Sequence, residues 1–179
     1  MIFKSTLMDK DAVLRSLRRI SHEIVEKNRG TSDLCLVGIL RRGVPMAEII
    51  AENIKRIEGV SIDVGILDIS LHRDDKDRLD ILKENKTKID FEISGKNVVL
   101  VDDVLYTGRS VRAAMDALMS MGRPAKIQLA TLIDRGHREL PVCANYIGKN
   151  FPTARTELIK VQFEGIDEET CVNLYDIED

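Results

Sequence analysis

Residues 98–110 read VVLVDDVLYTGRS, and this stretch decides the fold class. Its first four residues form a continuous apolar run, which is typical of a parallel strand that is buried on both faces. Two acids follow the run, and a short loop then leads into a helix expected over residues 110–121, with Gly122 at its end. Because ligands of open α/β sheets bind beyond the carboxyl ends of the strands, this loop marks a candidate site.

The sequence on either side alternates between helical and strand patterns. Apolar residues recur at helical spacing from Val13 to Ile24 and predict a helix over residues 9–28, with Asp9 as N-cap and Gly30 as its stop. The remaining expected elements are strands over residues 34–40, 60–71, 127–133, 145–147, 157–163 and 172–175, and a helix over residues 43–57. Strands that alternate with helices predict an α/β fold with a doubly wound, mostly parallel sheet flanked by helices, here in one domain over residues 1–179.

The charge of the chain is unevenly distributed. Its 27 Lys and Arg residues and 30 Asp and Glu residues give a net charge of −3, which argues against a uniformly basic nucleic-acid coat. Residues 161–179, however, hold seven acids and no Lys or Arg, which leaves a net charge of +4 on residues 1–160. A local basic surface therefore remains compatible with the composition.

Other classes of protein are not expected. No apolar run approaches the roughly 20 residues that a membrane span needs, and the first residues lack the apolar core of a secretory signal. The three cysteines, Cys35, Cys143 and Cys171, lie far apart and form no CxxC pair, so neither a disulfide framework nor a zinc site is indicated. We expect a protein of the reducing cytoplasm.

Residues 72–94 differ from the rest of the chain because they lack Gly and Pro and are dense in mixed charge. One interpretation is a long mobile loop, since loops of this length inside a compact domain are usually functional or disordered. A solvated helix or a hairpin over part of the segment is the alternative.

The loop after residue 101 has the chemistry of a phosphate site. The start of a helix offers N–H groups and the positive end of a dipole, Gly108 allows close backbone approach, and Thr107 and Ser110 add hydroxyl donors. Asp102 and Asp103 then need a different partner, either sugar hydroxyls or a bound Mg²⁺. The alternative interpretation is ordinary local structure, with two turn acids and an N-capping hydroxyl.

The pattern VVLVDDVxxTGxS resembles the phosphoribosyl diphosphate (PRPP) binding motif of the type I phosphoribosyltransferases. The resemblance implies that Asp102 and Asp103 face the ribose hydroxyls. It also implies that the following loop wraps the 5′-phosphate through Val104, Leu105, Tyr106, Thr107, Gly108, Arg109 and Ser110. A second family element, here Arg41-Arg42-Gly43 after the strand at 34–40, would hold the pyrophosphate, a role that suits the planar fork of Arg.

One position of this second element departs from the family. Members often have Lys-Thr-Arg-Gly where this chain has Leu40-Arg41-Arg42-Gly43, so Arg41 replaces a hydroxyl. The change adds positive charge on the pyrophosphate side and is expected to alter the efficiency of transfer.

Further segments resemble one branch of this family, the pyrimidine operon attenuation regulators that are also uracil phosphoribosyltransferases. They read DISLHRDD at 68–75, DRGHRELP at 134–141 and YIGKN at 146–150, and the likeness runs nearly end to end. It implies the type I fold with a small hood and a mobile loop at about 72–94, and a homodimer or higher homo-oligomer.

The implied reaction transfers phosphoribosyl from PRPP to N1 of uracil and gives UMP and diphosphate, with Mg²⁺ bound mainly through PRPP. The implied catalytic residues are Asp102, Asp103 and Arg42, while Arg135 and Ile159 lie on the base side. Arg73 and Arg78 are candidates to meet the pyrophosphate. Two alternatives stay open: a purely metabolic phosphoribosyltransferase for a purine base or orotate, and a nucleotide-sensing RNA-binding protein without catalysis.

The same resemblance implies binding of the pyr mRNA leader, promoted by UMP or UTP. Two basic segments suit such a partner, since residues 9–29 hold six Lys and Arg against four acids and residues 126–160 hold six against three. The residues that the resemblance assigns to RNA are Arg19, His22, Arg138 and Lys149. Two neighbouring positions depart from the usual pattern, because Arg18 replaces a Thr and Cys143 replaces a basic residue.

Overall fold

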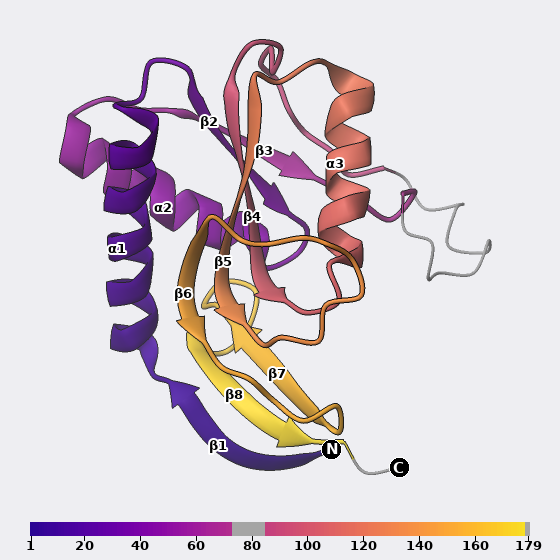
Figure 1. Ribbon diagram of the computed structural model, residues 1–179. Coiled ribbons are helices and arrows are strands. Elements are labelled where there is room, and N and C mark those ends of the chain that lie inside the picture. Colours follow the sequence, from indigo (N-terminus) through magenta and orange to yellow (C-terminus); the bar gives the residue numbers. More distant parts are fainter. Residues whose placement is uncertain (73–84, 178–179) are drawn as a thin grey trace.

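The computed structural model describes residues 1–72 and 85–177, and its centre is a five-stranded parallel sheet (Figure 1). In spatial order the strands are β3 (Asp63–Leu67), β2 (Leu34–Ile39), β4 (Asn97–Leu105), β5 (Lys126–Asp134) and β6 (Tyr146–Asn150). The central strand β4 pairs with β2 on one side and with β5 on the other, and the side chains of residues 98–101 are fully buried. This confirms the mostly parallel sheet that the sequence predicts.

Helices cover both faces of this sheet (Figure 1). Val99 and Val101 pack in the core under α1 (Lys10–Asn28) and α2 (Gly43–Glu58), while Val98 and Leu100 pack in a second core under α3 (Arg109–Met121). Successive side chains of a strand point to opposite faces, so a continuous apolar run feeds both cores.

The first helix begins and ends as its sequence predicts, with one shift at its end. Asp9 caps α1 by accepting a hydrogen bond from the Ala12 N–H at 2.8 Å. The left-handed residue that ends the helix is Arg29, with φ 56°, and the following N–H of Gly30 donates to the carbonyl of Val25 at 3.0 Å.

A second, antiparallel sheet lies beyond the carboxyl ends of β4, β5 and β6 (Figure 1). Its strands are β1 (Ile2–Met8), β8 (Cys171–Asp176) and β7 (Glu157–Gln162), in the order β1-β8-β7. This sheet is the predicted small hood, and its place beyond the strand ends brings the acidic stretch between β7 and β8 close to the candidate site.

Two sequence predictions need correction, and one strand of the structure is not predicted. The strand β1 is not predicted, because six of its seven side chains are at least partly exposed and carry no apolar alternation. The strand expected over 60–71 covers only β3, and the chain turns after it, with the His72 N–H donating to the Ile69 carbonyl at 3.0 Å. The strand expected to end at residue 101 continues to Leu105, so the two acids lie within β4 rather than after it.

The predicted mobile segment at 72–94 is described only in part. Residues 85–94 run back along β3, where Lys88 bridges Ile66, and Ile93 is buried in the core under α3. Arg73 and Arg78 lie outside the described residues, so their proposed contact with pyrophosphate stays a prediction. Among the helices of the described part, none is both long and apolar enough to cross a membrane.

Candidate active site

A cavity of about 330 Å³ lies where β4 passes into α3. It is lined by Asp102, by the unbroken run 104–111 and by Glu139. The structure therefore gathers around one cavity most of the residues that the sequence assigned to ribose and 5′-phosphate. Gly108 is the N-cap of α3 and lies in the left-handed region with φ 92°, a conformation that favours glycine.

The two acids of β4 point to different sides. Asp102 lines the cavity, while Asp103, as the next residue of the strand, lies on the face that carries α1 and α2. The Asp103 carboxylate accepts the Val104 N–H at 2.8 Å, and Asp102 accepts the Asp103 N–H at 3.0 Å. Burial raises the pKa of Asp103, although the Val104 N–H and the nearby charge of Arg42 act in the opposite direction.

The second predicted element, residues 41–43, lies directly against β4. Gly43 opens α2, and a Cβ atom built there would lie 2.2 Å from the carbonyl oxygen of Val101. Only glycine therefore lets the start of α2 approach the strand immediately before the acid pair. The peptide bond between Leu40 and Arg41 is cis, and the Arg41 side chain is exposed.

Arg42 has a partner that the sequence reasoning missed. Its Nη2 and Nε donate to the two carboxylate oxygens of Asp167, at 2.7 and 3.1 Å. Asp167 comes from the acidic stretch between β7 and β8, where it also accepts the N–H of Phe163 at 3.0 Å. The only sequence signal was the run of acids itself, because partners 125 residues apart are brought together by the packing of the hood.

The ion pair between Arg42 and Asp167 makes a prediction about stability and pH. Arg42 holds the pKa of Asp167 below its usual range, and the two side chains are only 28% and 12% exposed. A carboxyl whose pKa is lowered by folding stabilises the protein above its unfolded pKa, and this contribution is lost as the pH falls through the folded pKa. Asp167→Asn is therefore expected to lower the free energy of unfolding at about pH 6 by roughly 1–3 kcal/mol.

The measurement is urea unfolding of both proteins from about pH 6 down to about pH 3, over which the difference between them should shrink. Asp176→Asn is the matched control, because the pair between Lys4 and Asp176 is about 40% exposed on both sides and should contribute little. A difference between wild type and Asp167→Asn that stays constant with pH would argue against the ion pair as its cause.

The predicted base-side residues are both buried. Arg135 is 4% exposed, and its Nη2 donates to the carbonyls of Ala154 and Glu157 at 3.1 and 2.7 Å. Its guanidinium also lies 4.1 Å from the centroid of the Tyr106 ring. Arg135 thus joins the hood to residues 104–110, which we call the phosphate loop after the ligand predicted for it. The contact of Arg135 and Ile159 with a base stays a prediction.

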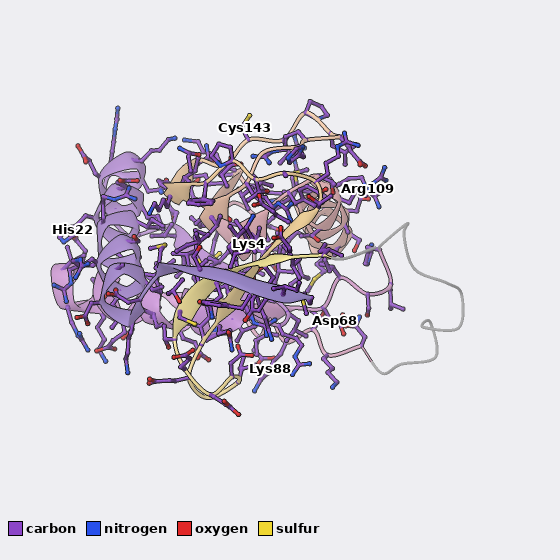
Figure 2. All side chains as sticks on the ribbon, turned by 90° about the horizontal axis from the view of Figure 1, so that it is seen from below. Lys4, His22, Asp68, Lys88, Arg109 and Cys143 are labelled. Carbon is purple, nitrogen blue, oxygen red and sulfur yellow. The ribbon has the colours of Figure 1, made fainter. Side chains whose placement is uncertain are left out.

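Three of the four predicted RNA residues lie along α1 and β6. The Arg19 Nη2 donates to the carbonyls of Ile147 and Gly148 at 2.9 and 2.7 Å, which joins the helix to the strand. Arg19 and Lys149 line a shallow groove of about 340 Å³ together with Arg15. His22 is exposed on α1, and Figure 2 places it across the molecule from Arg109 of the phosphate loop.

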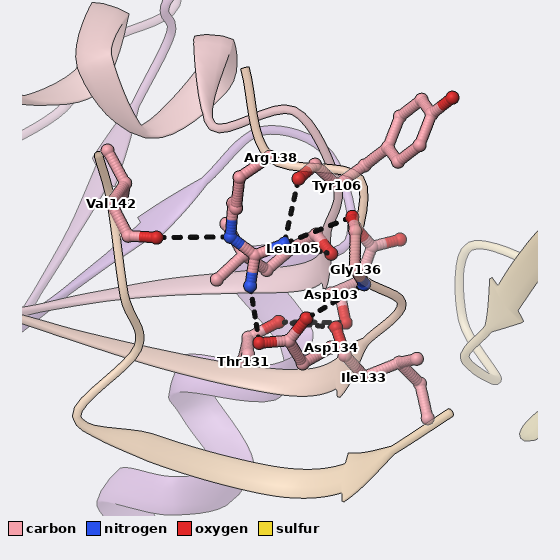
Figure 3. A network of polar contacts seen from close by, with 9 residues as sticks. All are labelled: Asp103, Leu105, Tyr106, Thr131, Ile133, Asp134, Gly136, Arg138 and Val142. Carbon is pink, nitrogen blue, oxygen red and sulfur yellow. Dashed lines mark hydrogen bonds and ion pairs between the residues drawn. The ribbon is translucent and has the colours of Figure 1, made fainter. Parts of the chain in front are cut away.

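The fourth, Arg138, lies elsewhere. Its guanidinium donates to carbonyl oxygens of the loops that follow β4 and β5, and to the carboxylate of Asp134 at the end of β5 (Figure 3). The structure therefore brings Arg19 and Lys149 together, with His22 on the same helix as Arg19, but separates Arg138 from them. Contact of any of the four with RNA stays a prediction.

A larger cavity of about 510 Å³ lies between α1, α2 and the hood. Its lining mixes opposite charges that already pair with one another, as Lys10 does with Glu164 at 2.7 Å and Arg56 with Glu52 at 3.2 Å. It presents no set of groups directed at one ligand, so the smaller cavity at the strand end is the better candidate.

Comparison with known proteins gives the family. The model of the phosphoribosyl transferase domain matches residues 5–156. Proteins named Bifunctional protein PyrR are similar over nearly the whole length: the one from Acetivibrio thermocellus is 58% identical over 99% of this chain and 97% of its own, and the one from Clostridium perfringens is 53% identical over 98% and 99%.

Solved structures with a similar fold include two hypoxanthine phosphoribosyltransferases. The enzyme of Trypanosoma cruzi has a TM-score of 0.75 at 16% identity and 98% coverage of both chains. The enzyme of Staphylococcus aureus has a TM-score of 0.71 at 17% identity, with 96% of this chain and 92% of the other covered. These two likenesses show the type I fold, and the matched domain together with the near full-length identities shows that the chain belongs to the PyrR family of phosphoribosyltransferases.

Proposed function

We propose that the protein transfers phosphoribosyl from PRPP to N1 of uracil and also regulates transcription attenuation of the pyr operon by binding its leader mRNA in response to UMP or UTP. The observation that carries the enzymatic half is the cavity lined by the loop between β4 and α3, with Arg42 nearby at the start of α2. The regulatory half is supported by relatives that are named bifunctional PyrR proteins. We further propose that it acts in the cytoplasm as a homodimer or larger homo-oligomer.

Each part of PRPP has a proposed partner at this edge of the sheet. The loop from Val104 to Ser110 takes the 5′-phosphate through N–H and hydroxyl donors, and the acid pair takes the ribose hydroxyls. Arg42 and Arg41 take the pyrophosphate, whose departure needs positive charge nearby. In this assignment the 5′-phosphate, the ribose and the pyrophosphate of PRPP are each bound by a different segment of the chain, and the three segments lie side by side at this edge of the sheet.

The described residues contain no group of three or more His, Cys, Asp or Glu side chains that would hold a metal ion by themselves. The carboxylates of Asp102 and Asp103 suit Mg²⁺, because this ion keeps several waters and is usually held through one or two carboxylates and the phosphates of a substrate. When bound with PRPP, Mg²⁺ would supply charge neutralisation at the leaving group.

The proposed reaction is a displacement at the anomeric carbon. The bond from C1′ to the pyrophosphate oxygen breaks and diphosphate leaves, while the bond from C1′ to N1 of uracil forms and the N1 proton passes to water. Positive charge develops on the sugar during the exchange, as in glycosyl transfer. A carboxylate fixed on the ribose side favours that charge. Asp103 is held by the Val104 N–H and is therefore oriented before substrate arrives.

The deciding experiment measures UMP formation from uracil and PRPP with Mg²⁺, with hypoxanthine, guanine and orotate as competing bases. We expect uracil to be the substrate. Use of a purine or of orotate in its place would replace the proposal with a purely metabolic phosphoribosyltransferase, and a protein that uses none of these bases but binds RNA would be a regulator without catalysis.

The proposed RNA surface is the groove between α1 and β6, with Arg19, His22 and Lys149 as its contacts. Two cations at its rim and a third, Arg15, suit the phosphates of an RNA hairpin, while the bases of the loop would be read by hydrogen bonds. Binding of a pyr leader hairpin should strengthen when UMP is added. No effect of UMP would remove the regulatory half of the proposal.

Lys149→Gln is expected to weaken RNA binding and to lower the salt dependence of log K by roughly one, as expected for one phosphate contact. Titration of the hairpin at several salt concentrations measures both quantities. Lys55→Gln removes another exposed charge, from the last turn of α2, and should change neither. Equal effects of the two substitutions would mean that net charge, and not the groove, governs binding.

A further inference from the structure

Arg138 binds the main chain of the phosphate loop on the side where β5 ends (Figure 3). Its Nη1 donates to the carbonyl of Tyr106 at 2.8 Å and to that of Leu105 at 3.3 Å. Its Nε donates to the carbonyl of Val142 at 3.0 Å, and its Nη2 pairs with the carboxylate of Asp134. The fork of one guanidinium therefore joins the loop after β4, the end of β5 and the segment that follows.

Main-chain N–H groups on either side of Arg138 also bind the phosphate loop. The N–H groups of Glu139 and Leu140 donate to the carbonyl of Thr107 at 3.0 and 3.2 Å, and the N–H of Arg135 donates to the carbonyl of Leu105 at 3.1 Å. Three consecutive carbonyls of the phosphate loop are thus bound by residues 135–140, the segment that the sequence sets apart from the shared PRPP motif.

This arrangement fixes the direction of the opposite ends of the same peptide units. In a trans peptide the N–H points away from the carbonyl. If the carbonyls of Leu105, Tyr106 and Thr107 are directed at residues 135–140, the N–H groups of Tyr106, Thr107 and Gly108 are turned to the other side. All three of these residues line the cavity that we assign to the 5′-phosphate.

Arg138 itself is poorly placed to bind RNA directly. Its side chain is 23% exposed, and Nε, Nη1 and Nη2 all donate to protein oxygens. A cation that served mainly to attract RNA phosphates would need an accessible guanidinium. The contacts instead match those of a residue that acts on the loop.

We infer that Arg138 is a positioning residue, which holds the Leu105–Gly108 loop in the conformation that binds the 5′-phosphate of PRPP and UMP. The inference rests on the proposed function, and it changes the role predicted for Arg138 from the sequence. An influence of Arg138 on RNA binding then passes through nucleotide affinity, because the nucleotide promotes RNA binding.

The test compares Arg138→Gln with Arg138→Lys in the full chain. Arg138→Gln should raise the Kd of UMP and the KM of PRPP by about tenfold or more, with a smaller change in kcat, because charged hydrogen bonds to the loop are lost. The Kd of uridine, which lacks the phosphate, should stay the same. Arg138→Lys keeps the charge but lacks the fork, so it should not restore UMP binding. Arg155→Gln, an exposed cation in the hood loop, is the matched control.

RNA binding separates the inference from a direct contact. The loss of RNA affinity in Arg138→Gln should disappear when UMP is raised to saturation. An RNA defect that persists at saturating UMP, is restored by Lys, and leaves the Kd of UMP unchanged would overturn the inference. Equal losses for UMP and uridine would also overturn it, because they indicate general damage. The two Kd values need no turnover, so a wild-type protein that binds UMP but forms none counts against the proposed function alone.

Discussion

Asp103→Asn is expected to lower kcat/KM for UMP formation by about a hundredfold or more, the scale seen when one preorganised group is removed from a charge-stabilising site. The carboxylate lies beside Arg42 at the strand end, where we place the sugar of PRPP, and Asn keeps its shape without its charge. Because positive charge develops on the sugar only in the transition state, the loss should fall mainly on kcat.

The same substitution should leave the protein at least as stable as the wild type. Burial raises the pKa of Asp103, so in the folded wild type its ionisation at neutral pH costs stability, and this cost grows as the pH rises from the unfolded pKa through the folded one. Asn removes the cost, so the stability of the variant relative to the wild type should increase over that interval.

Steady-state kinetics and urea unfolding of Asp103→Asn at several pH values check both statements. Asp116→Asn on the exposed side of α3 is the control and should leave kcat/KM unchanged. Full activity in Asp103→Asn would remove Asp103 from the ribose site, whereas a strongly destabilised variant would mean that the carboxylate supports the fold.

The parts of the fold that the sequence predicts well are those with a strong local pattern. The apolar run at 98–101 and the stripe from Val13 to Ile24 are continuous signals, and both lie in the fully buried core. The strand β1 carries no such signal, since Ile2 and Phe3 are half exposed and its order comes from pairing with β8, far away in the sequence. Alternation beyond residue 67 misled the prediction, because Ile69 is buried in a turn rather than in a strand.

The candidate site divides in the same way. The phosphate loop is one contiguous segment, so its residues are neighbours in the sequence and around the cavity. The ion pair of Arg42 with Asp167 depends on how the hood packs, and no local pattern encodes it. Arg138 shows a further limit. Composition counts it as one cation of a basic surface, whereas in the structure its guanidinium donates to the carbonyl of Tyr106 and the carboxylate of Asp134.

Gly43→Ala is expected to disturb both the fold and the site. The added methyl group would lie 2.2 Å from the carbonyl oxygen of Val101, which is backbone of the central strand and unable to turn aside. Alanine favours a helix over glycine by about 1 kcal/mol, but the overlap forces α2 and β4 apart at a cost of about 1–3 kcal/mol or more. The overlap should win, and the free energy of unfolding should fall.

The movement would also carry Arg42 away from the acid pair, so the KM for PRPP should rise together with the loss of stability. Gly59→Ala at the other end of α2 separates the two effects. A side chain there meets no atom within 4 Å but adopts φ 73°, so it should cost about 1 kcal/mol of stability and leave KM unchanged. If Gly43→Ala matched Gly59→Ala in both urea unfolding and KM, close packing of α2 on β4 would not be what places the pyrophosphate side of the site.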